Sequence, residues 1–192
     1  MCSIDFDSDL MLSAETTLNL CATGVAHEIL ETIPVPVSIA AAVVYSGEIT
    51  GVEFGLSEQR IPVLTLVSSL VDSGNLVVVK PQSDAEWETF YRYSHDRTLD
   101  NSEAALRAIV IHRNWIAACD DQITVNFFAG QKPPINTISS IGLIKFWSET
   151  TSIEHSVLVG ALNRAHLNAH LEPKANHPLY DWWRANSSKQ SN

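Results

Sequence analysis

Apolar positions along the chain follow two patterns, short β-branched runs and longer stretches with helical spacing. The short runs predict strands at Met11–Thr16, Val35–Ile39, Leu76–Val79, Trp115–Cys119 and Ile135–Thr137. Leu76–Val79 is the clearest buried strand of this set, because all four of its residues are apolar.

The longer stretches predict helices, because apolar residues recur at intervals of three and four and helix-stop residues follow. These stretches are Thr17–Gly24, Val25–Thr32, Ala40–Tyr45, Ile61–Ser73, Asp84–His95, Asp100–Arg113, Ile141–Glu149 and Ile153–His170. Strands that alternate with helices are typical of a parallel sheet covered on both faces, so the predicted fold class is α/β.

The length and composition fit one globular domain. The chain has 192 residues, 45 % of them hydrophobic and 18 % charged, and no apolar run approaches the roughly 20 residues that span a bilayer. The predicted organisation is an N-terminal extension over residues 1–10, one domain with a C-terminal helical part over residues 11–186, and a frayed tail over residues 187–192.

The cysteines and the N-terminus indicate a cytoplasmic protein. Cys2, Cys21 and Cys119 are far apart, odd in number and without zinc-type spacing, which predicts reduced thiols. Residues 1–9 carry three aspartates and no lysine or arginine, which is unlike a secretory signal.

Net charge limits the partners. The chain has 12 lysines and arginines against 22 aspartates and glutamates, a net charge of −10. Permanent binding to nucleic acid needs a basic footprint, so this balance argues against it. A nuclease remains compatible, because its carboxylates hold cations that themselves meet the phosphate. Phosphate-binding glycine loops and a nucleophile elbow are absent from the sequence, which disfavours nucleotide-cofactor enzymes and serine hydrolases.

Three acidic residues stand at predicted strand ends. Glu15 lies at the end of the first strand, and Asp120 and Asp121 follow Trp115–Cys119. Ligands in open parallel sheets collect beyond the carboxyl ends of the strands, so this edge is the predicted site.

Three segments carry a resemblance to a known family: MLSAETTLNLCATG from Met11, LDNSEAALRAIVIHRNWIAACDDQ from Leu99, and HPLYDWW from His177. They resemble the PIN nuclease-like family, in particular its bacterial branch of predicted nucleic-acid-binding proteins. The resemblance runs from about Met11 to Trp183 and implies a Rossmann-like PIN fold with a central, mostly parallel sheet. It also implies that the strands starting at Met11 and Trp115 are neighbours in that sheet.

Members of this family cleave RNA with Mg²⁺ or Mn²⁺ held by three or four carboxylates, the hard oxygen ligands that such ions prefer. The resemblance places Glu103 at the third acid position and Asp120 or Asp121 at the fourth. It places Ser13 at the first position and Ala42 or a neighbour at the second, so two acids are missing. Asn19 is a further residue expected in the cleft, bonded either to a metal-bound water or to a backbone group.

Glu15 is a replacement for the missing first acid if the strand extends that far, because alternate side chains of a strand share a face. The predicted metal ligands are therefore Glu15, Glu103, Asp120 and Asp121, with Glu103, Asp120 and Asp121 as the catalytic set. Glu48 and Glu53 lie downstream of the second position, but their spacing does not place them in the cleft.

Structural interpretations compete with these assignments. Asp100 and Glu103 match a helix-capping arrangement, and Asp120 and Asp121 match a strand-ending turn. His166, His170 and His177 have partial metal-ligand spacing, but a solvated helix end is favoured. For Tyr180, Trp182 and Trp183, packing on the domain surface is favoured over stacking on bases.

Two functions follow from this reading. The first is a metal-dependent endoribonuclease with an incomplete acidic site, whose substrate is RNA and whose cofactor is Mg²⁺ or Mn²⁺. The second is a non-catalytic PIN-fold interaction module whose partner is a protein, as in a toxin–antitoxin-like pair, or a second copy of the chain. Neither function involves a membrane.

Overall fold

The computed structural model describes residues 5–45, 49–56, 59–96 and 99–187. The strands are β1 (Leu10–Leu12), β2 (Val37–Ala40), β3 (Glu53–Leu56), β4 (Gln59–Pro62), β5 (Val77–Val79), β6 (Ile116–Ala118) and β7 (Thr137–Ile138). The helices are α1 (Ala14–Ala22), α2 (Ala26–Glu31), α3 (Ala41–Tyr45), α4 (Val63–Asp72), α5 (Asp84–Ser94), α6 (Asn101–Arg113), α7 (Gln122–Ala129), α8 (Ser140–Thr150), α9 (His155–Ala169) and α10 (Tyr180–Asn186).

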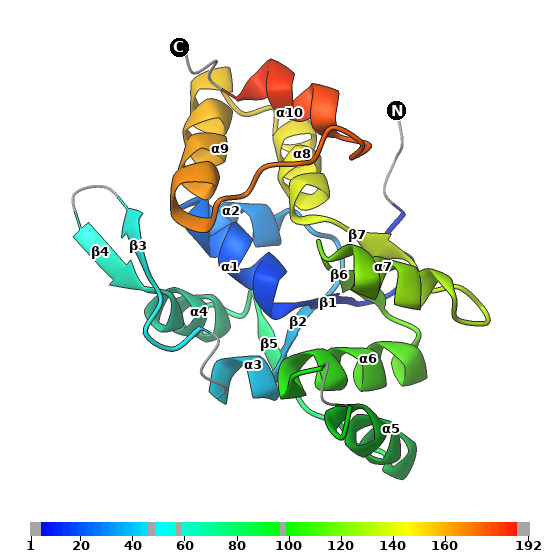
Figure 1. Cartoon of the computed structure of the whole chain (residues 1–192). Coiled ribbons are helices and arrows are strands. Elements are labelled where there is room, and N and C mark those ends of the chain that lie inside the picture. The colour runs from blue at the N-terminus through cyan, green and yellow to red at the C-terminus, as the bar shows by residue number, and fades with distance from the viewer. Residues whose placement is uncertain (1–4, 46–48, 57–58, 97–98, 188–192) are drawn as a thin grey trace.

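Five strands form one parallel sheet in the order β5-β2-β1-β6-β7 (Figure 1). The central strand is β1, in which Leu10 is in register with Val37 on one side and with Ile116 on the other. Parallel neighbours need crossover connections, and the intervening helices provide them. The predicted α/β class, with a mostly parallel sheet in a Rossmann-like arrangement, is confirmed.

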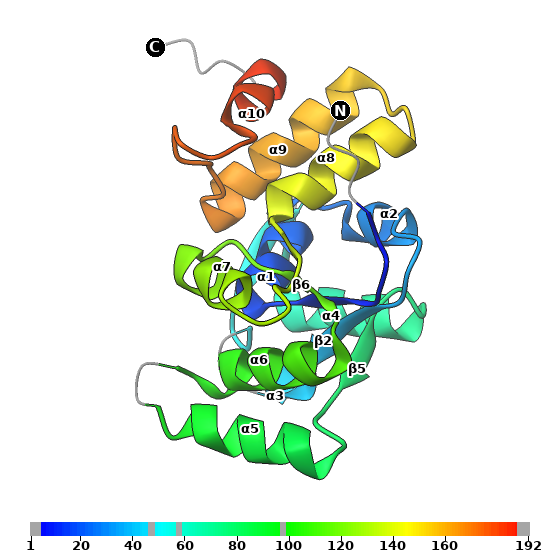
Figure 2. The ribbon, with the colours of Figure 1, turned by 90° about the vertical axis from the view of Figure 1, so that its right-hand side faces the viewer.

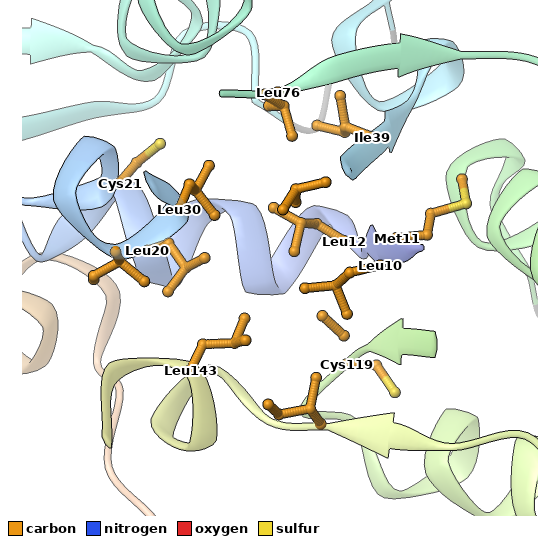
Figure 3. Close-up of a cluster of buried hydrophobic side chains, with 14 of the residues drawn as sticks. Leu10, Met11, Leu12, Leu20, Cys21, Leu30, Ile39, Leu76, Cys119 and Leu143 are labelled. Atoms are coloured by element: carbon orange, nitrogen blue, oxygen red, sulfur yellow. The ribbon is translucent and has the colours of Figure 1, made fainter. Parts of the chain in front are cut away.

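Helices cover both faces of this sheet (Figures 1 and 2). α1, α2 and α8 lie on one side, with α9 and α10 beyond them, while α6 contacts β1, β2 and β6 from the other side and α5 packs outside α6. Figure 3 shows part of the resulting core, where leucines of β1, α1, α2 and α8 meet in one buried cluster.

The first predicted strand is too long at its C-terminal end. Met11–Thr16 contains only the last two residues of β1, and the chain then turns directly into α1. The reason is local, because the hydroxyl of Ser13 accepts the backbone N–H of Thr16 and so caps the helix. Glu15 consequently lies in the first turn of α1 rather than on a strand, and the alternation argument for it was wrong.

Three other predictions need correction. The segment Leu76–Val79 contains β5, but this strand is at the edge of the sheet and Val77 is 47 % exposed, so it is not a buried strand. Ile61 belongs to the antiparallel hairpin β3–β4, which was not predicted, and α4 begins only at Val63. Helix α7 was also missed, because its few polar residues obscure the helical period.

The chain ends of the domain pack against the C-terminal helices. The ring of Phe6 lies edge-on against Phe146 of α8, with centroids 5.0 Å apart. Trp183 in α10 is 4 % exposed, which confirms the predicted packing role of this tail. Residues 1–4 and 188–192, with most of the predicted frayed tail, lie outside the described residues. Among the described helices, none has the length and apolar character needed to cross a membrane.

A buried ion pair joins α5 to the end of α6. The carboxylate of Glu86 accepts Nε–H of Arg113 at 2.7 Å and a second guanidinium nitrogen at 3.2 Å. It also accepts the backbone N–H groups of Gln82 and Ser83. The Arg113 hydrogen bond, aided by those backbone bonds and opposed by burial, lowers the pKa of Glu86 from 4.5 to about 2.

This depressed pKa predicts an acid-sensitive contribution to stability. The pair stabilises the fold above pH 4.5 and loses its effect as the pH falls towards 2, because the carboxylate is then protonated. Glu86→Gln should lower the free energy of unfolding at pH 7 by roughly 3 kcal/mol, since it leaves Arg113 buried without a counter-charge. Urea unfolding at several pH values measures the difference.

The control is Glu88→Gln in the same helix, because Glu88 pairs with Arg92 where both side chains are exposed. Its effect should stay below about 0.5 kcal/mol. A Glu86→Gln deficit that is the same at pH 7 and pH 2.5 would contradict the assigned cause.

Candidate acidic site at the carboxyl edge of the sheet

The carboxyl ends of β1 and β6 meet at one edge of the sheet. The two strands pair in parallel, and the backbone N–H of Ser13 donates to the carbonyl of Ala118 at 2.9 Å. The predicted adjacency of these strands is therefore confirmed. It brings the start of α1 next to Cys119, Asp120 and Asp121.

Asp120 is held by hydrogen bonds from two helices. Its Oδ1 accepts the backbone N–H of Ser140 at 2.9 Å, and its Oδ2 accepts the hydroxyl of the same serine in a very short contact. Oδ2 also accepts the side-chain amide of Asn19 at 3.1 Å. The hydroxyl of Thr16 lies 3.3 Å from Oδ2 and 3.1 Å from the carbonyl of Ala118, so its single proton serves one acceptor at a time.

These contacts give Asp120 and Asn19 structural roles. The amide of buried Asn19 also reaches the hydroxyl of Ser140 at 3.2 Å, so it joins α1 to α8 directly. Asp120 in turn connects the end of β6 to both helices. Neither residue is among those that line the neighbouring pocket.

A pocket of about 520 Å³ opens beside this network, between the starts of α1, α6 and α7. Three of the predicted acidic residues line it: Glu15, Glu103 and Asp121. Ser13 also lines it, whereas Ala42 in α3 packs against the hydrophobic core and does not. The remaining lining residues are Ala14, Leu18, Leu99, Asp100, Ser102, Arg107, Cys119, Ile123 and Thr124.

Glu103 is engaged by a cation and a hydroxyl. Its Oε1 accepts Nε–H of Arg107 at 2.9 Å and the hydroxyl of Thr124 at 2.7 Å. The side chains of both Glu103 and Arg107 are largely buried, 19 % and 8 % exposed. Asp100 caps α6 by accepting the N–H of Glu103 at 2.7 Å, as the capping interpretation predicted. The carboxylate of Glu103, however, turns to Arg107 and Thr124 instead of completing a capping box.

Asp121 caps α7. Its Oδ2 accepts the backbone N–H of Thr124 at 2.8 Å and lies 2.9 Å from the hydroxyl of Thr124, whose single proton serves either Asp121 or Glu103 at a time. Partial burial opposes ionisation, but hydrogen bonds from Thr124 and Ile123, together with the charge of Arg107, hold the pKa of Asp121 below its ordinary value. Asp121 therefore combines the predicted turn role with a place in the pocket wall.

Glu15 lies exposed in the first turn of α1 and lines the pocket together with Glu103 and Asp121. Partial desolvation raises the pKa of Glu15, and the negative charges of Asp120, Asp121 and Glu103 raise it further. Glu15 is thus close enough to the other three acids for their charges to oppose its ionisation. Within the described residues, Glu15 has no cationic partner.

The acidic side chains of the described residues do not converge on one point in this arrangement. Mg²⁺ and Mn²⁺ need several oxygen ligands that converge on one point. In the described part of the chain, no three acidic, histidine or cysteine side chains converge in that way. Arg107 already pairs with Glu103 and Asp120 is bonded to Ser140 and Asn19, so the carboxylates surround a pocket without forming an ion cage.

Among the other candidate groups that the structure describes, Cys119 lines the pocket, whereas Cys21, Glu53 and the three histidines do not. His170 ends α9 in the left-handed conformation, His166 is 3.8 Å from Glu172, and His177 accepts the N–H of Leu179. Cys21 and Cys119 are buried free thiols, and burial raises the pKa of Cys21 to about 12. Cys2 and Glu48 lie outside the described residues, and Glu53 pairs with Arg60 in the hairpin.

Sequence reasoning overlooked Arg107, Thr124 and Ser140. A signal for the first was present, because Glu103 and Arg107 are four residues apart on one helix, the spacing of an ion pair. Ser140 had no such signal, since its contact with Asp120 depends on the β6–β7 pairing.

Comparison of the chain with family models, with curated proteins and with solved structures finds no match in any of the three. Function is therefore inferred from the site itself.

The two adjacent aspartates should differ in how much each contributes to the free energy of unfolding. Asp120→Ala leaves buried Asn19 and Ser140 without their acceptor, so we expect a loss of roughly 3 kcal/mol in the free energy of unfolding. Asp121→Ala removes only a helix cap, with an expected loss of about 1 kcal/mol. Chemical denaturation of both variants measures the two losses. Equal losses would show that the hydrogen bonds of Asp120 stabilise the fold no more than the helix cap of Asp121 does.

Like-charge crowding predicts that Glu15→Gln stabilises the protein. Because the pKa of Glu15 is raised in the fold, its ionisation costs stability as the pH rises through that value, and no cost exists when it is protonated. We expect a gain of about 0.5 kcal/mol at pH 7, limited by solvent screening, and none below about pH 4. Thermal unfolding at low and at high salt measures the gain, which salt should reduce.

Glu28→Gln is the matched control, since Glu28 is also exposed in the first turn of a helix but is not in the pocket. If both variants gain stability equally, the crowding explanation fails.

Proposed function

We propose that this chain is a PIN-like domain of the metal-dependent ribonuclease class whose acidic site is degenerate. It binds Mg²⁺ or Mn²⁺ weakly and hydrolyses RNA feebly. The observation that carries the proposal is the pocket at the carboxyl edge of β1 and β6, which is lined by Glu15, Glu103 and Asp121.

The fold supports the family expectation without deciding it. The resemblance implies a central, mostly parallel sheet, and the five-stranded sheet of this chain is parallel, with β1 at its centre. Glu103 and the Asp120–Asp121 pair, at the expected third and fourth acid positions, come to the same edge of that sheet. This shared edge supports the proposal.

Three departures support degeneracy. The first acid position holds Ser13, which lines the pocket without a charge. The resemblance places Ala42 or a neighbour at the second, and Ala42 packs against the core. At the third, Glu103 is already neutralised by Arg107 at 2.9 Å. RNA hydrolysis in this class relies on cations that activate water and offset phosphate charge. These departures remove most of the negative charge that would bind such cations.

A second candidate is a non-catalytic interaction module, and the hydrogen bonding of Asp120 favours it. A carboxylate with both oxygens bonded to Asn19 and Ser140 serves the fold rather than chemistry. In this case the partner is a protein, antitoxin-like or a second copy of the chain. For both candidates we propose a cytoplasmic location, on the basis of the buried free thiols of Cys21 and Cys119.

Restoring charge at the first position should restore cation binding. Ser13→Asp keeps the helix cap, because aspartate caps as well as serine, and it adds a unit negative charge to the pocket wall. We expect Mn²⁺ affinity to rise roughly tenfold or more over wild type, since affinity follows ligand charge. Calorimetric titration with MnCl₂ measures affinity, and cleavage of a fluorescent single-stranded RNA measures activity.

Ser13→Asn is the matched control, because it has the shape of aspartate and the same capping ability without the charge. Tight Mn²⁺ binding and strong RNA cleavage by the wild type would contradict the proposed degeneracy. If Ser13→Asp and Ser13→Asn bind Mn²⁺ equally poorly and neither cleaves RNA, the ribonuclease assignment fails and the interaction module stands.

A further inference from the structure

The pocket contains its own cation. Arg107 lines it together with Glu15, Glu103 and Asp121, and the residue is only 7 % exposed. An arginine side chain stays charged in proteins, so a positive charge is fixed where the resemblance places a metal ion.

Several contacts hold this charge in place. Nε of Arg107 donates to Glu103 at 2.9 Å. The guanidinium carbon lies 4.1 Å from the ring centroid of Phe127 in α7 and 5.9 Å from that of Tyr93 in α5. Aromatic faces attract a desolvated cation. The charge of Arg107 also acts on Asp121, where it favours the ionised carboxylate.

We infer that Arg107 is an internal counter-ion that takes the place of the divalent cation and weakens the binding of metal in the acidic pocket. The inference rests on the proposed function, because it explains why a pocket lined by acids fails to form an ion cage. The guanidinium neutralises Glu103 and bonds to its Oε1, the same oxygen that accepts the hydroxyl of Thr124. A metal ion has to displace this charge or bind beside it, and both are unfavourable.

Removal of the guanidinium should therefore open the site. In Arg107→Gln the side chain keeps its length in part but loses its charge, and the repulsion among Glu15, Glu103 and Asp121 then favours binding of a small cation. We expect Mn²⁺ affinity to rise at least tenfold over wild type. MnCl₂ should also raise the Tm of this variant, because a ligand that binds only the folded state stabilises it.

Arg113 provides a matched control within the same helix. It also pairs with a buried glutamate, Glu86, and lies over an aromatic ring, that of Trp115 at 4.8 Å, but it is not part of the pocket. Arg113→Gln should cost stability without any gain in Mn²⁺ affinity. The double variant Arg107→Gln with Glu103→Gln should lose the gain, because it also removes the released carboxylate.

The experiment is calorimetric titration of the wild type and these variants with MnCl₂ alone, accompanied by thermal unfolding in MnCl₂ and in NaCl of equal ionic strength. A tenfold gain in Arg107→Gln only, abolished in the double variant, is the expected result. Equal affinity in the wild type and Arg107→Gln overturns the inference. If Arg107→Gln is unfolded without metal, recovery of the fold in MnCl₂ but not in NaCl supports the inference, and no recovery overturns it.

The wild type offers an independent measurement. The Nε–H resonance of Arg107, assigned by its loss in Arg107→Lys, should not broaden selectively at low Mn²⁺ concentration, because the guanidinium keeps the affinity of the pocket for the ion low. Selective broadening at low Mn²⁺ concentration would overturn the inference. None of these measurements uses RNA, so absence of RNA cleavage counts against the proposed function alone.

Discussion

The bonds to Asp120 hold the carboxyl edge of the sheet together. One carboxylate, at the end of β6, accepts donors from the body of α1 and from the first residue of α8. Charge-assisted hydrogen bonds of this kind are about twice as strong as neutral ones. Because they join two helices to one strand end, the position of α1, of its cap and of the pocket beside it all depend on them.

Each carboxylate at this edge can either stabilise the fold or act as a metal ligand. A carboxylate bonded to backbone N–H groups and hydroxyls stabilises helix starts, whereas a metal ligand must present an oxygen to an ion. In this protein the carboxylates of Asp120, Asp121 and Glu103 each accept hydrogen bonds from protein donors, so they serve the stability of the fold. Glu15 alone remains without such a donor in the described chain, and it is the acid whose ionisation its neighbours oppose.

Periodicity and strand-end reasoning carried the prediction a long way. The β-branched run at Val37 and the apolar run at Ile116 are both strands of the parallel sheet, and the acids after the second run do lie at its edge. The spacing of Asp100 and Glu103 correctly placed the start of α6. These features are local, so a single sequence contains them.

Features that depend on distant pairing were not available in the same way. The end of β1 was misplaced because one hydroxyl cap, on Ser13, starts the helix earlier than the apolar pattern suggests. The exposure of Val77 follows from the order of the strands, which a run of valines does not encode. The charge of Arg107 acquires its role only when α7 brings Phe127 over it.

The outer strands of the sheet have a consequence for self-association. An exposed strand edge is a template on which another chain can extend a sheet, and long flat edges invite aggregation. Here β5 has three residues and is followed by Lys80 and Pro81, and β7 has two residues before the chain turns into α8. Proline has no N–H to donate and lysine resists burial. A strand that docked on β5 could therefore form backbone hydrogen bonds only along its three residues. The short edge strands β5 and β7 thus disfavour extension of the five-stranded sheet by another chain.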